Sequence, residues 1–258
     1  MSLLRLIARL DIKGHAVVKG IQMEGLRVVG KPEEMAKRYA ESGADEILYI
    51  DTVASLYGRN QLEALLEKTS EEVFIPITVG GGIASQEDAR RLFNAGADKI
   101  AVNTAALKRP TLVNELADHF GSQAVVVSIE AKRVNGGWEC YTDNGRQRTG
   151  MDVARWTVDT VTRGAGELLV TSVDRDGTSR GFDTELVASI APNVPVPVTA
   201  SGGMGTLEHL RAVLEHGHAD AVAMASVLHY GKLTFDEMRE ALKRVDYPNQ
   251  LALDAPPC

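Results

Sequence analysis

Short apolar runs rich in Val, Ile and Leu alternate with longer amphipathic segments along the whole chain. The longer segments, such as "KPEEMAKRYAESGA", "SQEDARRLFNAGA" and "TLEHLRAVLEHGHA", repeat their apolar positions with the period of an α-helix. Strands that alternate with helices form parallel sheets, and 258 residues hold eight such units. We therefore predict an α/β fold, a single (β/α)8 TIM barrel over residues 1–258. The predicted strands are residues 4–12, 46–51, 74–79, 99–102, 124–129, 168–173, 195–200 and 221–224.

Two segments and the C-terminal tail interrupt this alternation. Residues 14–31 are too long for a plain connection between a strand and a helix, and they predict a mobile loop over one mouth of the barrel. Residues 133–148 contain Gly-Gly and Asn-Gly, which are dipeptides of tight turns, and they predict a small hairpin. The tail, about residues 247–258, contains prolines and is predicted to be loose.

Four sequence boxes occur twice, in the same order and at an offset of about 120 residues. "GADEILYI" returns as "GAGELLVT", "TVGGGI" as "TASGGM", "ADKIAVNTA" as "ADAVAMASV" and "LDIK" as "IEAK". One glycine-rich box can recur by chance, but four in order indicate a duplication. We therefore predict two equivalent half-barrels, at about residues 1–121 and 122–245.

The glycine-rich boxes predict two anion sites at the mouth of the barrel. Each box directly follows a predicted strand, and glycine lets backbone N–H groups approach an anion closely. One unit later, "NTA" and "ASV" end strands and precede helices, whose first amides favour phosphate. A single box is equally well a tight turn, but two symmetric pairs predict two phosphate cups and a ligand with a phosphate at each end.

Asp11 and Glu130 occupy matched positions at the ends of the first and fifth predicted strands. Opposed carboxyl groups across a substrate suit general acid and general base roles. The alternative is that each acid is a solvated strand end or pairs with a neighbour, Lys13 or Lys132. The symmetry of the pair, between two phosphate cups, favours the catalytic interpretation.

Three further residues are candidates for contacts at the mouth. Asp51 ends an apolar strand, and we expect it to contact substrate. Asp176 lies in an Asp-Gly sequence, so an alternative role is to organise its own loop. Lys19, in the first long loop, is the cation expected to close over a ligand, unless it is simply solvated.

Four charged residues form a separate set near strand starts, at the opposite end of the barrel from the predicted mouth. They predict a charged ring at the base, which acts either as a structural plug or as a gate to a central passage. The set comprises Arg5, Glu46, Lys99 and Glu167.

Composition narrows the classes of function. The formal net charge of −7 argues against broad binding of nucleic acid, which normally requires a basic surface. Two cysteines are too few for a disulfide framework, and the six histidines show no metal-ligand spacing, so we expect no metal. The first residues carry arginines within their apolar stretch and resemble neither a signal peptide nor a membrane span. These features predict a cytoplasmic protein without membrane association.

The boxes together identify a family. The chain resembles the cyclase subunit of imidazole glycerol phosphate synthase along nearly its whole length. The matching segments are "LDIKGHAVVKG", "IDTVASLYGR", "TVGGGI", "GADKIAVNTAA", "FGSQAVVV", "GAGELLVTSVDRDGT" and "ASGGM". The sibling sugar-isomerase family shares the half-barrel repeat and the phosphate cups, but "GSQAVVVSIEAKR" followed by a hairpin and "TSVDRDGTSRGFD" is not expected in it.

The resemblance implies an ammonia-dependent lyase in histidine biosynthesis. A separate glutaminase subunit would dock on the strand-start face, and ammonia would pass the four-residue gate. A bisphosphorylated formimino ribulosyl nucleotide would be converted into imidazole glycerol phosphate and aminoimidazole carboxamide ribotide, with Asp11 and Glu130 as acid/base catalysts and no cofactor. The implied substrate and phosphate contacts are Lys19, Asp51, Gly82, Asn103, Thr104, Thr171, Asp176, Gly177, Ser201, Gly202, Gly203, Ala225 and Ser226.

Two departures from the family pattern bear on the substrate. The family has aspartate at the position of Glu130 and usually cysteine at the position of Arg9. Arg9 alternates with Asp11 on one face of the strand, so it adds a cation inside the barrel or near the catalytic acid. Two alternatives follow: a divergent relative that delivers ammonia to another acceptor, such as a surface-polysaccharide sugar, and a non-catalytic barrel that activates a glutaminase.

Overall fold

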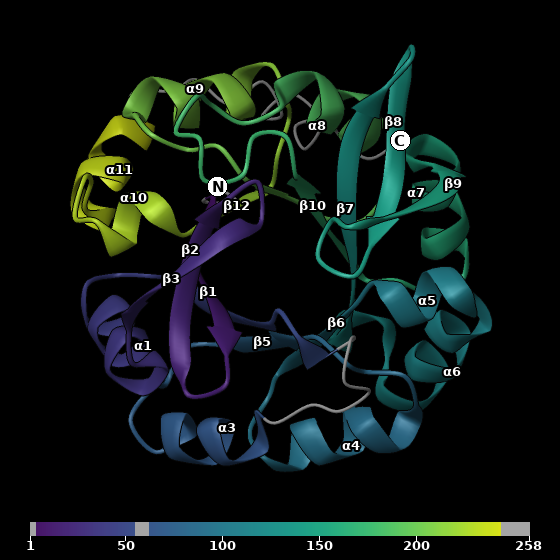
Figure 1. Ribbon diagram of the computed structural model, residues 1–258, viewed down its shortest axis with the longest axis horizontal. Helices are drawn as coiled ribbons and strands as arrows, with labels where there is room; N and C mark the ends of the chain where they lie inside the picture. Colours follow the sequence, from purple (N-terminus) through teal and green to yellow (C-terminus); the bar gives the residue numbers. More distant parts are fainter. Residues whose placement is uncertain (1–3, 55–61, 244–258) are drawn as a thin grey trace, which may run out of the picture.

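A ring of eight parallel strands forms the centre of the computed structural model, which describes residues 4–54 and 62–243 (Figure 1). The ring closes because the first strand pairs with the last and because the fifth pairs with the sixth. This arrangement confirms the predicted (β/α)8 barrel. In chain order the strands are Arg5–Lys13 (β1), Glu46–Asp51 (β4), Ile77–Gly80 (β5), Lys99–Val102 (β6), Val125–Val134 (β7), Glu167–Ser172 (β10), Val198–Ser201 (β11) and Ala221–Met224 (β12).

Helices surround the ring and cover the outer face of the strands (Figure 1). A short helix follows the fourth barrel strand of each half, β6 and β12, so the two halves also match in these connections. The α-helices are Pro32–Glu41 (α1), Glu63–Ser70 (α3), Gln86–Asn94 (α4), Thr104–Lys108 (α5), Thr111–Phe120 (α6), Val153–Thr162 (α7), Thr184–Ile190 (α8), Leu207–Glu215 (α9), Ser226–His229 (α10) and Phe235–Leu242 (α11). Two short 3-10 helices span Ser122–Ala124 and Ala191–Asn193. None of the described helices is long and apolar enough to span a membrane.

A β-hairpin follows the first strand of each half. The expectation of a loop over residues 14–31 is wrong, because this segment forms Ala16–Ile21 (β2) and Glu24–Gly30 (β3), and β2 pairs with β1. Gln22 and Met23 form the turn of the hairpin, with positive φ angles of 52° and 63°. Glycine and asparagine are the residues that usually adopt such angles, and neither is present at these two positions, so the sequence carries no signal for this turn.

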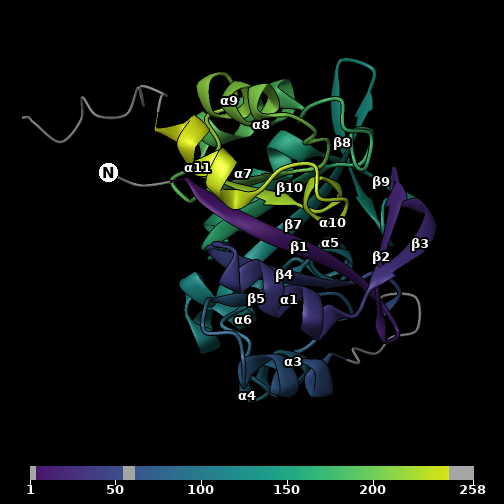
Figure 2. The same ribbon diagram turned by 90° about the vertical axis from the view of Figure 1, so that its left-hand side faces the viewer.

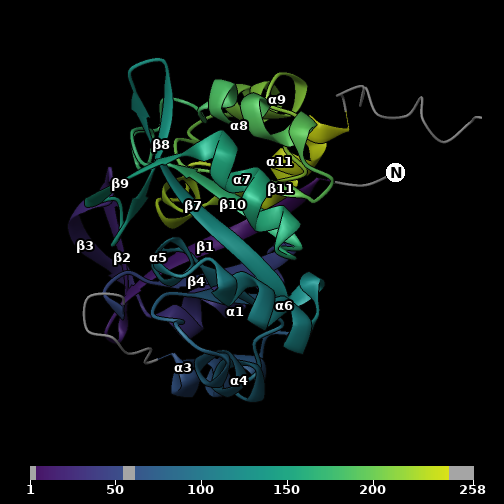
Figure 3. The ribbon, with the colours of Figure 1, turned by 90° about the vertical axis from the view of Figure 1, so that its right-hand side faces the viewer.

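The second hairpin is confirmed and is longer than expected. β7 continues to Val134 and pairs with Gly137–Thr142 (β8), which pairs with Gln147–Asp152 (β9). Figures 2 and 3 show both hairpins at the same end of the barrel, opposite the end at which β1 begins. This end is therefore the mouth, at the carboxyl ends of the barrel strands.

Two predicted strands begin later than expected. The strand expected from residue 74 begins at Ile77, and the one expected from residue 195 begins at Val198. A proline precedes each start, and proline has no N–H to donate to a ladder. The Pro76 and Pro197 carbonyls still accept hydrogen bonds from the neighbouring strands, at 2.9 and 3.0 Å. The predicted tail, 247–258, lies outside the described residues.

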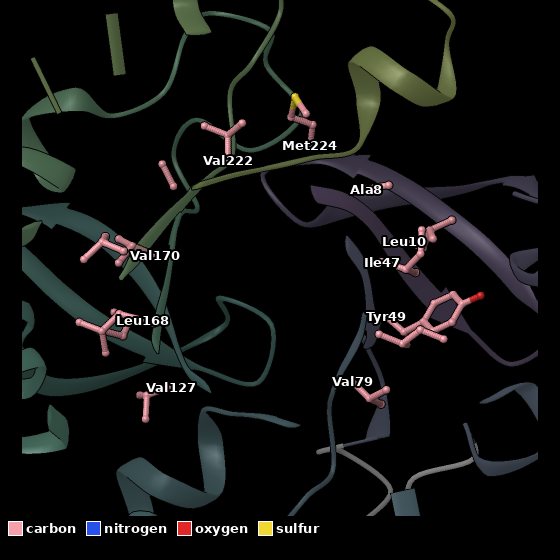
Figure 4. Packing of buried hydrophobic residues seen from close by; sticks show 14 of the residues in the cluster. Ala8, Leu10, Ile47, Tyr49, Val79, Val127, Leu168, Val170, Val222 and Met224 are labelled. Carbon is pink, nitrogen blue, oxygen red and sulfur yellow. The ribbon is translucent and has the colours of Figure 1, made fainter. Parts of the chain in front are cut away.

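The core has two layers because side chains of a strand alternate between its faces. The large outer layer lies between strands and helices, and Figure 4 shows Tyr49, Val127 and Leu168 among its members. A small inner layer fills the barrel between its base and its mouth. It consists of Ile7, Leu48, Ala101, Val126, Leu169, Ala221 and Ala223, with Ile50 packed against it.

Candidate active site

Asp11 and Glu130 face each other across the mouth. They lie on β1 and β7, which are four strands apart in either direction around the ring. Odd-numbered residues of β1 and even-numbered residues of β7 point inward, since Ile7 and Val126 belong to the inner layer. The predicted opposition of the two acids is therefore present in the structure.

Asp11 is buried, with 5% of its surface exposed, and two cations bind it. Arg9 Nε donates to Asp11 Oδ1 at 2.8 Å, and Lys19 Nζ lies 3.4 Å from Oδ2. Burial alone favours the neutral acid, but the two positive charges outweigh it and lower the pKa of Asp11 below its ordinary value. Asp11 is accordingly a carboxylate at neutral pH.

Glu130 has the opposite environment. The backbone N–H of Gly145, in the turn between β8 and β9, donates to Glu130 Oε2 at 2.7 Å. Burial raises the pKa of Glu130 to about 7, and the hydrogen bonds from Gly145 and Asn103 and the more distant charge of Arg9 offset only part of this effect. At neutral pH this carboxyl group is therefore able to give or take a proton.

The cup of the first half is an open cavity of ≈ 230 Å³. Gly81 and Gly82 turn its wall with φ angles of 104° and 70°, and a side chain at Gly81 would collide with the Asp51 carbonyl. Among the described residues, no partner hydrogen-bonds the buried Asn103 Oδ1. The side chains and backbone that line the cavity include Asp51, Gly82, Asn103, Thr104, Lys108, Ser128, Glu130 and Asn144.

The cup of the second half is almost filled, with a free volume of ≈ 20 Å³. That volume holds about one water molecule, so a phosphate requires rearrangement. Arg9 Nη1 donates to Thr171 Oγ1 at 3.0 Å and to Ser201 Oγ at 3.1 Å, and Lys19 Nζ pairs with Asp176 Oδ2 at 2.7 Å. This cup is also lined by five of the residues predicted to contact phosphate: Gly177, Gly202, Gly203, Ala225 and Ser226. Their contact with phosphate stays a prediction.

The four charged residues at the strand starts form a closed ring. Arg5 contacts Glu46 at 3.0 Å and Glu167 at 2.7 Å, and Lys99 contacts the same two acids at 2.8 and 2.9 Å. Burial opposes the charge of Glu167, but Arg5 and Lys99 lower its pKa below the ordinary value. The structure thus brings together the predicted set, with alternating signs, beneath the inner apolar layer.

Lys19 differs from its expected setting. It lies on β2 rather than in a loop, it is 4% exposed, and it is already paired with Asp176 and Asp11. Asp51 Oδ1 accepts the N–H groups of Val53 and Ala54, so Asp51 also shapes its own loop.

The sequence analysis missed four residues that line the open cup or hold Glu130: Lys108, Ser128, Asn144 and Gly145. The Asn-Gly turn of the hairpin is the signal for Gly145, and the even-residue alternation of β7 is the signal for Ser128. Among residues 4–54 and 62–243, no three His, Cys, Asp or Glu side chains are grouped as for a metal ion.

Comparison with known proteins decides the family. The model of the histidine biosynthesis protein family matches residues 5–234, most of the chain. The chain belongs to the histidine biosynthesis protein family. A protein of this family from Legionella pneumophila is 61% identical over 209 residues, which cover 81% of this chain and 99% of that protein. It is named imidazole glycerol phosphate synthase subunit HisF. Family membership agrees with the resemblance inferred from the sequence boxes.

Proposed function

We propose that this protein is the ammonia-dependent cyclase subunit of an imidazole glycerol phosphate synthase. The observation that carries the proposal is the pair of opposed carboxyl groups at the mouth, one held as a carboxylate and the other able to exchange a proton near neutral pH. The name of the Legionella pneumophila relative supports the same activity. The substrate is the bisphosphorylated formimino ribulosyl nucleotide, and the products are imidazole glycerol phosphate and aminoimidazole carboxamide ribotide.

The two carboxyl groups take different roles in this reaction. Ammonia adds to the ketose carbonyl carbon of the substrate, and protonated Glu130 donates a proton to the developing alkoxide. The Asp11 carboxylate accepts the proton that the attacking nitrogen loses. Ring closure and cleavage of the adduct then follow between the same two groups. The open cup holds one substrate phosphate with Gly82, Asn103 and Thr104, and the second cup receives the other after Lys19 leaves Asp176.

We further propose that a glutaminase subunit docks on the strand-start face and supplies ammonia through the charged ring. The ring lies at that face, and the side chain of Arg5 is 31% exposed. Phe74, which precedes β5 at the same end, is 89% exposed, and aromatic residues are enriched in protein interfaces. The word "subunit" in the name of the relative supports a complex for that protein.

One observation favours a second candidate. The free volume of the second cup, ≈ 20 Å³, fits an acceptor with a single phosphate better than one with two. Under this alternative the protein delivers ammonia to a different acceptor, such as a sugar. The two candidates share the ammonia chemistry of Asp11 and Glu130 and differ in the ligand of the second half.

Ammonium-dependent turnover of the formimino nucleotide by the purified chain tests the proposal. Turnover that Glu130→Gln abolishes and Glu130→Asp lowers supports the cyclase, because glutamine cannot exchange a proton and aspartate cannot reach the Gly145 N–H without movement. Absent turnover with retained phosphate binding favours the second candidate. Stimulation of a glutaminase without any chemistry at the mouth indicates a non-catalytic barrel, and full activity of Glu130→Gln contradicts the assignment of Glu130.

A further inference from the structure

Arg9 is a buried cation in the barrel interior that the proposed reaction does not use. It is 4% exposed, and all three of its hydrogen bonds are to groups on the strands of the barrel. A buried guanidinium is costly unless a carboxylate pairs with it and its other donors are satisfied. Asp11 supplies the carboxylate, and the hydroxyls of Thr171 and Ser201 fix the plane of the guanidinium. The side chain is therefore held in one orientation.

Of the two cations near Asp11, Arg9 is the closer partner. Arg9 Nε lies 2.8 Å from Asp11 Oδ1, whereas Lys19 Nζ lies 3.4 Å from Oδ2 and only 2.7 Å from Asp176 Oδ2. Asp176, on the loop after β10, is therefore the main ion-pair partner of Lys19. If a ligand phosphate in the second cup draws Lys19 away, Arg9 remains on Asp11 because the hydroxyls of Thr171 on β10 and Ser201 on β11 hold it.

The charged groups around Asp11 come from several elements. Arg9 lies on the same strand, Lys19 on β2, Asp176 after β10, Glu130 on the opposite strand and His229 on α10. Burial lowers the pKa of His229 to about 4, so it is neutral at physiological pH. The other four groups are two cations, Arg9 and Lys19, and two acids, Asp176 and Glu130. Of the two cations, Arg9 makes the shorter contact with Asp11.

The equivalent position of the second half carries no such cation. Ser128 stands two residues before Glu130, as Arg9 stands two residues before Asp11. Ile50 and Gly80 occupy the places that match Thr171 and Ser201, so the first half also lacks the hydroxyls that brace the guanidinium. The brace is therefore built on one side of the mouth only.

We propose that Arg9 is a positioning residue for the reaction: it clamps the Asp11 carboxylate from inside the barrel, so that Asp11 enters the reaction as the carboxylate base and Glu130 carries the proton that is donated. The assignment of roles rests on the function proposed above. The clamp itself rests on the contacts of Arg9 and holds for any acceptor that the mouth takes.

The pH profile of ammonium-dependent kcat/KM, at constant free ammonia, tests the clamp in Arg9→Met. Methionine fills much of the same volume without charge, and Arg9→Lys keeps the charge as the matched control. In the parent, Asp11 stays ionised across the profile. In Arg9→Met we expect the pKa of Asp11 to rise, because one of its two cationic partners is lost, and a new acid limb to appear in the profile. The loss of kcat/KM is then greatest at the acid end of the profile, about severalfold near pH 5, and negligible near pH 8. Arg9→Lys restores most of the parent profile.

A purely structural role predicts a different result. If Arg9→Met lowers kcat/KM by the same factor at every pH, or leaves the profile unchanged, Arg9 only packs the barrel and the clamp is refuted. Because this variant can fail to fold, the parent is measured as well, by NMR titration of carboxyl carbons with Asp11→Asn and Glu130→Gln for assignment. We expect Asp11 to titrate below the ordinary aspartate pKa of about 3.9 and Glu130 to titrate near pH 7. Titration of Asp11 at or above that ordinary value overturns the clamp, even if the nucleotide is not the substrate.

Discussion

The two halves of the barrel share a backbone plan and differ at their mouths. Each half has four barrel strands, a hairpin after the first strand, a glycine turn after the third and a short helix after the fourth. Gly81 and Gly202 both take positive φ angles, 104° and 91°, beside the carbonyl of the preceding barrel strand. Yet one cup has ≈ 230 Å³ of free volume and the other ≈ 20 Å³. A shared backbone plan therefore does not impose equal sites.

A few side chains account for the difference. The second half has Thr171 and Ser201 where the first half has Ile50 and Gly80, and these hydroxyls hold Arg9 within the second cup. The same arrangement gives Asp11 a cation as its partner and leaves Glu130 with a backbone N–H. Symmetry sets where the two acids stand, and their neighbours set which of them holds a proton.

Removing either acid is expected to have the largest effect. Asp11→Asn and Glu130→Gln keep the size of the side chains and remove their proton exchange, so each lowers kcat for ammonium-dependent turnover by about a hundredfold to ten-thousandfold. Steady-state kinetics of both variants measure this loss. Equal, small losses in both would show that the two halves do not supply an acid and a base.

An arginine at position 128, which matches position 9 in the other half, is expected to remove the difference in free volume between the two cups. Ser128→Arg places a guanidinium two residues before Glu130 and fills the open cup, so we expect the KM for the phosphorylated substrate to rise by about tenfold or more. The same charge lowers the pKa of Glu130 and shifts the pH profile downward. Ser128→Ala is the control and leaves both KM and profile nearly unchanged. If Ser128→Arg behaves like Ser128→Ala, the volume of the first cup does not govern binding.

A change in the charged ring at the base of the barrel is expected to lower glutamine-dependent turnover and to leave ammonium-dependent turnover nearly unchanged. Glu167→Gln removes a charge that Arg5 and Lys99 both contact. With the glutaminase partner present, glutamine-dependent turnover is expected to fall by about tenfold, because the gate is reorganised, while ammonium-dependent turnover stays near the parent value. Rates with the two nitrogen sources measure the split. Parallel losses with both would assign the ring a structural role.

The smallest expected effect is on stability. The folded-state pKa of Glu130, about 7, lies above its value in the unfolded chain, so the unfolded state releases this proton first and stability falls as pH rises from about 4.5 to about 7. The Glu130→Gln variant has no ionisable group at this position, so its stability does not fall for this reason as pH rises. Since Glu130 lines a water-accessible cavity, we expect a gain of only about 1–2 kcal/mol near pH 8 and almost none near pH 4. Urea unfolding of parent and variant at both pH values tests the sign.

The barrel and the positions of the two acids can be predicted from the sequence, because the sequence signals for them are local or periodic. Alternating strand and helix patterns predict the barrel, and the offset between "LDIK" and "IEAK" places Asp11 opposite Glu130. The charged set at the strand starts also follows, since its members occupy matching positions in their strands.

Other features depend on tertiary contacts that no local pattern marks. Lys19 and Asp176 are 157 positions apart, and their ion pair forms only when the first hairpin folds over the mouth. The course of the Arg9 side chain depends on hydroxyls from β10 and β11. The proton affinity of Glu130 depends on how deeply its carboxyl group is buried, which the residue pattern of β7 does not quantify.

The pH dependence of ammonium-driven turnover by the parent protein tests the central claim most directly. With free ammonia held constant, the claim is that a protonated Glu130 and an ionised Asp11 act together at the mouth. We predict that the rate falls as pH rises through about 7 and that no second ionisation appears down to about pH 5. A rate that is flat from about pH 5 to pH 8.5, or one that rises through pH 7, would contradict the account.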